Sequence, residues 1–130
     1  MKKMLGIDYG SKRIGIAISD DEGKIAFPKV ILNNDEKLFQ NIEKIIMEEK
    51  ISGIVLGESL NYLGEKNEIM KDIEKFKTKL EEGLNLPVYF EQEFMTSMQA
   101  RRTMKQSNNE TVKLDDSAAA IILQSYLDKE

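Results

Sequence analysis

The first quarter of the chain carries short apolar segments with the period of β-strands. Residues 4–8 form an apolar run that ends in a carboxylate, Asp8, and residues 13–19 alternate, with isoleucines at every second position on one face. A third β-rich run, residues 24–31, follows the turn signal DDEG. The pattern predicts three strands, of which the last two form a hairpin.

The period then changes, and apolar positions at helical spacing alternate with short apolar runs. An Asn/Asp cluster is the expected cap of the first helix, and Gly83 is the expected stop signal of the second. The predicted elements are helices over residues 33–50, 69–82, 96–106 and 115–129, and strands over residues 51–57 and 86–93.

The predicted order βββαβαβαα favours an α/β fold in which a mixed central β-sheet has helices on both faces, because αβ units prefer parallel neighbours and right-handed crossovers. No repeat, low-complexity tract or linker divides the chain, so residues 1–130 are expected to form a single domain. Such sheets place their sites at the carboxyl ends of parallel strands.

Composition limits the chemistry that this chain can perform. The chain has no Cys and no His, which removes thiolate zinc sites and the commonest general base, so catalysis must use carboxylates, Lys, Tyr, Ser/Thr or a hard metal such as Mg²⁺. No apolar run is long enough to cross a membrane and no signal peptide is apparent, so a cytoplasmic protein without a membrane partner is expected. The net charge of −4 gives no global attraction to nucleic acid.

Three carboxylates fall at the ends of predicted elements that can converge. Asp8 closes the first strand, Glu93 closes the last strand, and Asp115 or Asp116 opens the last helix. Carboxylate oxygens suit Mg²⁺, and two such ions could hold the attacking water and the leaving oxygen of a phosphodiester in line. Each acid also has an ordinary alternative, as a turn residue, a solvent-facing strand end or a helix cap.

Several motifs resemble those of the bacterial pre-16S rRNA nuclease family, also called Holliday-junction-resolvase-like proteins. The segments are LGIDYGSKRIGIAISD, GESLNYLGEKNE, EFMTSMQA and DDSAAAIILQSYL, and the similarity runs from Met4 to Leu127. This resemblance implies a ribonuclease-H-like fold, with Asp8, Glu93 and Asp115 as catalytic, metal-binding acids. It also implies hydrolysis of phosphodiester bonds in structured nucleic acid, dependent on Mg²⁺ or Mn²⁺.

Two motifs depart from the family pattern. Where the family has Asp-Glu-Arg-Leu-Thr-Thr, residues 92–97 read Gln-Glu-Phe-Met-Thr-Ser, so the acid and the hydroxyl pair remain while Phe94 replaces the arginine. Loss of a fixed guanidinium beside the acids predicts a slow nuclease. In the loop at residues 57–64 a proline and an Asp are absent and Glu58 is added, which predicts an altered substrate-facing rim.

Helical geometry favours Asp115 over Asp116 as the third acid. Ser117 and Gln124 lie seven residues apart and are expected to mark the outward stripe of the closing helix. Asp115 is about 200° from Ser117, on the face expected to press against the sheet, whereas Asp116 is on the flank.

Basic residues near these acids are the expected contacts for phosphate groups. The predicted nucleic-acid-binding residues are Lys12, Arg13, Thr96, Arg101, Arg102 and Lys105. The leading functional hypothesis is processing of the 5′ end of pre-16S rRNA by a monomer or weak homodimer, and the nearest alternatives are cleavage of branched DNA and a catalytically weak nucleic-acid-binding module. An actin-like ATPase remains a distant alternative, because its nucleotide sites lie between two related domains.

Overall fold

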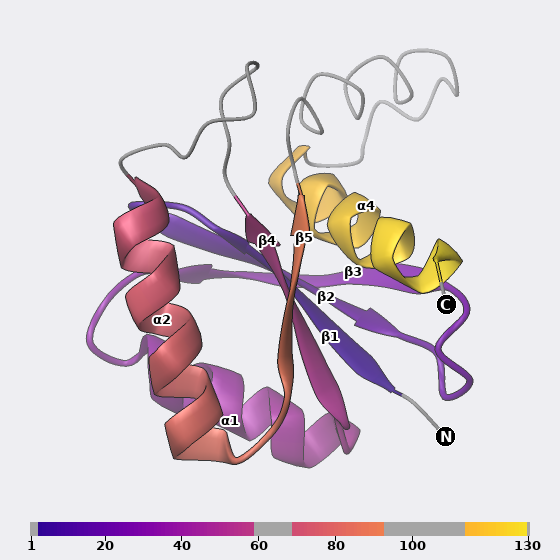
Figure 1. The fold of residues 1–130 in the computed structure, drawn as a ribbon, viewed down its shortest axis with the longest axis horizontal. Helices are drawn as coiled ribbons and strands as arrows, with labels where there is room; N and C mark the ends of the chain where they lie inside the picture. The colour runs from indigo at the N-terminus through magenta and orange to yellow at the C-terminus, as the bar shows by residue number, and fades with distance from the viewer. Residues whose placement is uncertain (1–2, 59–68, 93–113, 130) are drawn as a thin grey trace.

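A computed structural model describes residues 3–58, 69–92 and 114–129, which form a five-stranded mixed sheet with helices on both faces (Figure 1). The strand order across the sheet is β3-β2-β1-β4-β5. β1 is antiparallel to β2 and parallel to β4, β2 is antiparallel to β3, and β4 is parallel to β5. The strands are β1 (Met4–Tyr9), β2 (Arg13–Ser19), β3 (Ala26–Asn33), β4 (Gly53–Glu58) and β5 (Val88–Gln92). The predicted α/β class and mixed sheet are therefore confirmed.

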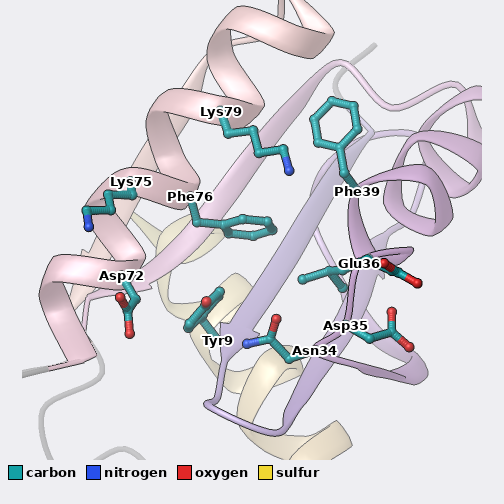
Figure 2. A pocket seen from close by; sticks show the side chains of 10 residues that line it. Tyr9, Asn34, Asp35, Glu36, Phe39, Asp72, Lys75, Phe76 and Lys79 are labelled. Atoms are coloured by element: carbon teal, nitrogen blue, oxygen red, sulfur yellow. The ribbon is translucent and has the colours of Figure 1, made fainter.

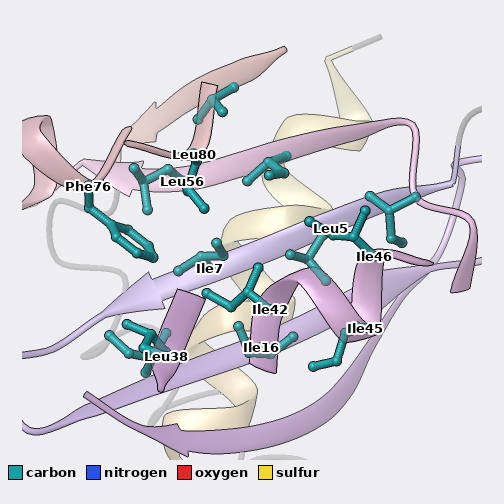
Figure 3. Close-up of a cluster of buried hydrophobic side chains, with 14 of the residues drawn as sticks. Leu5, Ile7, Ile16, Leu38, Ile42, Ile45, Ile46, Leu56, Phe76 and Leu80 are labelled. Carbon is teal, nitrogen blue, oxygen red and sulfur yellow. The ribbon is translucent and has the colours of Figure 1, made fainter. Parts of the chain in front are cut away.

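The two faces of the sheet carry separate hydrophobic cores. Side chains alternate along a strand, so Leu5 and Ile7 of β1 face α1 (Leu38–Glu49) and α2 (Ile69–Leu84), as Figure 3 shows for the larger core. Met4, on the opposite face, packs with residues of α4 (Leu114–Asp128). None of the helices in the described ranges is long and apolar enough to cross a bilayer.

The close approach of α4 to the central strand depends on Gly6. A Cβ built on Gly6 would lie 2.7 Å from the Cβ of Leu123 and 3.2 Å from the carbonyl oxygen of Ala119. Real Cβ atoms do not approach so closely, so only glycine allows this contact. The packing fixes where the N-terminal end of α4 lies relative to the carboxyl end of β1.

Two predicted helix boundaries are wrong. The first helix begins at Leu38, and Asp35 accepts a hydrogen bond from the Lys37 N–H at 3.0 Å rather than capping the helix. The second helix continues through Gly83, and Asn85 supplies the positive φ of 55° that follows its end. Glycine is needed at position 83 for another reason, because a Cβ there would run into the ring of Phe39.

The predicted outward stripe of the closing helix is wrong at Gln124. Its side chain accepts a hydrogen bond from the Ala26 N–H at 2.9 Å and donates one to the Lys24 carbonyl at 2.9 Å. Gln124 therefore joins α4 to the start of β3 instead of marking the solvent face. The start of the third strand was also predicted early, at residue 24 instead of Ala26.

Candidate active site

Asp8 lies at the carboxyl end of the central strand, where the sheet topology predicts a site. It is half-buried on the penultimate position of β1, opposite Gly15 of β2. Met4 packs against α4, and because side chains alternate along a strand, Asp8 lies on the same face of the sheet as Met4. Its cavity of about 230 Å³ is lined by Asp8, Gly10, Ser11, Lys12, Arg13 and Gly15.

Glycines flank Asp8 on both neighbouring strands. Gly15 is its direct partner on β2, and the parallel register Ile7↔Leu56 brings Gly57 of β4 to the level of Asp8 on the other side. Neither residue has a side chain that could cover the carboxylate from a neighbouring strand. The sequence contained both glycines, but a role for Gly57 could be recognised only from the strand register.

Lys12 and Arg13 line the same cavity as Asp8, and both are exposed. The tight connection from β1 to β2 places them there, because Asp8 is one residue before the end of β1 and Arg13 begins β2. The structure therefore brings one predicted acid and two predicted phosphate-contacting cations together. Cations beside a carboxylate at an open cavity can bind a phosphate group whose charge the acid alone would repel.

The structure does not describe the side chains of the remaining predicted site residues, and for most of them it does not describe the backbone either. The backbone at position 115 belongs to the first turn of α4, whereas the side chains of Asp115 and Asp116 are outside the description. Residues 93–113 are outside it entirely, and they include Glu93, Phe94, Thr96, Arg101, Arg102 and Lys105.

Glu91 is an acid near the end of β5 that sequence reasoning did not select. It is buried, at 6% exposure, and its Oε2 accepts a hydrogen bond from the Lys129 ammonium at 2.8 Å. Its pairing with Gly57 shows that it lies close to the carboxyl edge of the sheet. The ion pair with Lys129 joins β5 to the C-terminal end of α4, a contact that the sequence position of Glu91 did not reveal.

Glu58, the acid added in the loop motif, lies at the same edge but on the opposite face. Val55 of β4 packs against α4 whereas Leu56 packs in the larger core, so alternation directs Glu58 to the face of α1 and α2. Glu58 therefore does not join Asp8. Within the described residues, no group of three or more acids could hold a metal ion.

The Ser19-Asp20 pair of the opening motif is distant from Asp8. Ser19 is buried, and its hydroxyl accepts a hydrogen bond from the Met4 N–H at 2.7 Å, at the start of β1. The Asp20 carboxylate accepts hydrogen bonds from the N–H groups of Lys24 and Ile25, which lower its pKa below the usual value. The pair shapes the turn between β2 and β3, at the opposite end of the sheet.

A family model described as RuvX, Holliday junction resolvase, matches residues 2–129. The chain belongs to this family. Curated relatives of the chain are named "Putative pre-16S rRNA nuclease". A Sulfurihydrogenibium relative is 38% identical over 99% of this chain and 92% of its own length, and one from Paraburkholderia xenovorans is 36% identical over 96% and 87%. The chain is thus a member of a family of nucleases.

Solved structures with little sequence similarity share the fold. The T. thermophilus RuvC in complex with a Holliday junction substrate gives a TM-score of 0.63 at 13% identity, covering 99% of this chain and 96% of that one. The fowlpox virus resolvase in its Holliday junction complex gives 0.58 at 15% identity, covering 98% and 97%. The predicted ribonuclease-H-like fold is therefore confirmed.

Proposed function

We propose that this RuvX protein is a divalent-metal-dependent nuclease that hydrolyses phosphodiester bonds in structured nucleic acid, with the 5′ end of pre-16S rRNA as its substrate. The observation that carries the proposal is Asp8 in an open, glycine-flanked cavity that also holds Lys12 and Arg13. The relatives' printed names support the choice of RNA. The family description supports a second candidate substrate, the Holliday junction.

The donor chemistry at Asp8 fits Mg²⁺ or Mn²⁺. A carboxylate beside an open cavity, in a chain with no His and no Cys, is the oxygen-ligand environment that hard cations prefer. Asp8, Glu93 and Asp115 would hold the metal, which when bound supplies an activated water and stabilises charge on the phosphate.

Two structural relationships support Glu93 and Asp115 as the other ligands. Asp115 precedes Ala119 and Leu123 by four and eight residues, and both of those residues lie against Gly6, so helical spacing gives position 115 the same helix face as the two residues that contact β1. Tyr89 stacks on Tyr126 of α4 and Glu91 binds Lys129, so the odd-numbered positions of β5 face α4, and Glu93 is the next odd-numbered position in the sequence.

The chain's own residues then have distinct tasks. The three acids would hold the metal, and the metal, when bound, would position the scissile phosphate and the attacking water. Lys12 and Arg13 bind the adjacent phosphates from the hairpin. Arg101, Arg102, Lys105 and Thr96 are proposed to extend this contact along the substrate, while the absence of an arginine at Phe94 makes turnover slow.

Cleavage assays with purified protein test this function directly. Wild type should cut a pre-16S rRNA fragment carrying the 5′ end in Mg²⁺ or Mn²⁺ and lose cleavage in EDTA, and Asp8→Asn and Glu93→Gln should each reduce the rate at least a hundredfold. Glu91→Gln is the matched control, because its carboxylate is already paired with Lys129. Cleavage of a Holliday junction alone would favour the second candidate, and unchanged cleavage by Asp8→Asn would reject the mechanism.

A further inference from the structure

A second cavity, of about 280 Å³, opens at the same end of the sheet on the face opposite Asp8. Tyr9 directly follows Asp8 and lines this cavity, and the Asn34 side chain in its wall donates a hydrogen bond to the Gly10 carbonyl at 2.8 Å. The cavity is therefore joined to the hairpin turn that borders the Asp8 cavity, and a substrate strand that passes over Gly10 would reach both.

Three aromatic side chains, those of Tyr9, Phe39 and Phe76, line this second cavity (Figure 2). Tyr9 contacts Phe76 of α2 with ring centroids 5.1 Å apart, and Phe39 of α1 lies on the other side. Tyr9 and Phe39 are half-buried, so part of each ring remains accessible for contact with a planar ligand. Ring faces of this kind bind nucleobases of any sequence by stacking.

Lysines of α2 also line this cavity. Lys75 and Lys79 line the cavity, and Lys71 precedes them by one turn, so exposed lysines recur at every fourth position along one side of α2. The Lys79 ammonium lies 5.4 Å from the centroid of the Phe39 ring, which holds this cation beside an aromatic surface. A row of cations next to aromatic rings matches the alternating phosphates and bases of a single strand.

Three acids, Asp35, Glu36 and Asp72, line the cavity together with the two lysines. Asp35 uses its carboxylate in the turn before α1, where it accepts the Lys37 N–H. In Figure 2 the side chains of Asp35 and Glu36 point away from Tyr9 and Phe76. Asp72 lies beside Tyr9, where its carboxylate could accept hydrogen bonds from the amino group of a bound base.

We propose that this cavity binds an unpaired nucleotide of the substrate, its base against Tyr9 and Phe39 and its flanking phosphates on Lys75 and Lys79. The inference rests on the proposed function for the class of ligand, and it adds a requirement for single-stranded nucleic acid next to the cleavage point. A base can stack on Tyr9 and Phe39 only after it has left the duplex stack, because the faces and pairing edges of duplex bases are already occupied.

Binding measurements without turnover test the proposal. A short fluorescein-labelled single-stranded RNA is titrated with full-length protein in EDTA, and fluorescence anisotropy is followed at several salt concentrations. Lys75→Gln/Lys79→Gln should weaken binding about tenfold and reduce the slope of log K against log salt by about 1.4, because each phosphate contact on a single strand contributes about 0.7. Lys24→Gln/Lys44→Gln, at exposed positions outside this cavity, is the matched control and should bind as wild type does.

Changes in the probe test the base contact separately. An abasic strand of the same length should bind wild type about tenfold more weakly than the intact strand. A blunt duplex should bind wild type and the Lys75→Gln/Lys79→Gln variant with the same affinity. Equal binding by the two double variants, equal binding of the abasic strand, or no single-strand binding by wild type would each overturn the proposal. Cleavage that depends on Asp8 but not on Lys75 and Lys79 would reject this site while the proposed function stands. Single-strand binding that depends on Lys75 and Lys79, without any cleavage, would reject the proposed function while this site stands.

Discussion

Gly6 of β1 and Leu123 of α4 lie so close together that a Cβ on Gly6 would be 2.7 Å from the Leu123 Cβ. Gly6 precedes Asp8 by two residues on the same face of the strand, and Leu123 follows Asp115 by two helical turns. The contact therefore sets the distance between the two elements that carry Asp8 and Asp115, two of the three proposed metal-binding acids.

Gly6→Ala should consequently lower both stability and cleavage. Overpacking at a closed contact costs about 1–3 kcal/mol, and displacement of α4 would move position 115 away from Asp8. Urea denaturation and the cleavage rate measure the two effects. Gly53→Ala is the control, because a Cβ there would meet the end of the flexible Met4 side chain at 3.0 Å, which can move aside. Equal losses in the two variants would contradict this role of Gly6.

Separate substitutions distinguish the adjacent acids at the start of α4. Asp115→Asn should reduce metal-dependent cleavage at least a hundredfold, because position 115 shares a helix face with Ala119 and Leu123. Asp116→Asn should leave cleavage near the wild-type rate and change the free energy of unfolding by less than about 1 kcal/mol, as a charge at a helix N-terminus does. The reverse pattern would exchange the two assignments.

The turn that holds Asp20 should make stability depend on pH in acid. The N–H groups of Lys24 and Ile25 lower the pKa of Asp20 in the folded protein. The ionised Asp20 carboxylate therefore contributes its full stabilisation above the pKa of the unfolded state, which is near the usual Asp value. This stabilisation is lost as the pH falls through the lower pKa of the folded state. Asp20→Ala should therefore be less stable than wild type at neutral pH, and the difference should shrink below about pH 4.

Urea denaturation of both proteins across this range measures the effect, and Asp21→Ala, whose side chain is 74% exposed, is the control. A difference between wild type and Asp20→Ala that stays constant from neutral pH into acid would contradict the role of the two N–H donors.

Lys50 at the end of α1 offers a stabilising substitution. Its backbone has φ 56° and ψ 52°, and its N–H donates to the Ile46 carbonyl, so a side-chain-bearing residue occupies the left-handed position that favours glycine. Lys50→Gly should raise the free energy of unfolding by about 1 kcal/mol. Lys44→Gly, in the interior of the same helix, should lower it by about the same amount. Thermal denaturation measures both, and destabilisation by Lys50→Gly would show that the Lys50 side chain matters more than its backbone.

Hydrophobic periodicity by itself determined the strand and helix content of the described residues, whereas the helix predicted over residues 96–106 lies outside them. Alternation at Ile14, Ile16 and Ile18 and helical spacing from Ile69 to Leu80 each require burial of one face, and the structure buries those faces. Resemblance in the motifs around Asp8 and in the closing helix identified the family and its fold. Both signals are local in the chain, which is why the sequence carried them.

Helix boundaries and contacts between distant elements were decided only by the tertiary structure. The sequence pattern predicts a helix stop at Gly83, but this glycine leaves room for the ring of Phe39. The pattern also predicts a solvent-facing Gln124, but its side chain binds the start of β3. The glycines on either side of Asp8 come from β2 and β4, two strands that lie beside β1 only in the folded sheet. Packing and register join residues far apart in the chain, and no local pattern records which of them will meet.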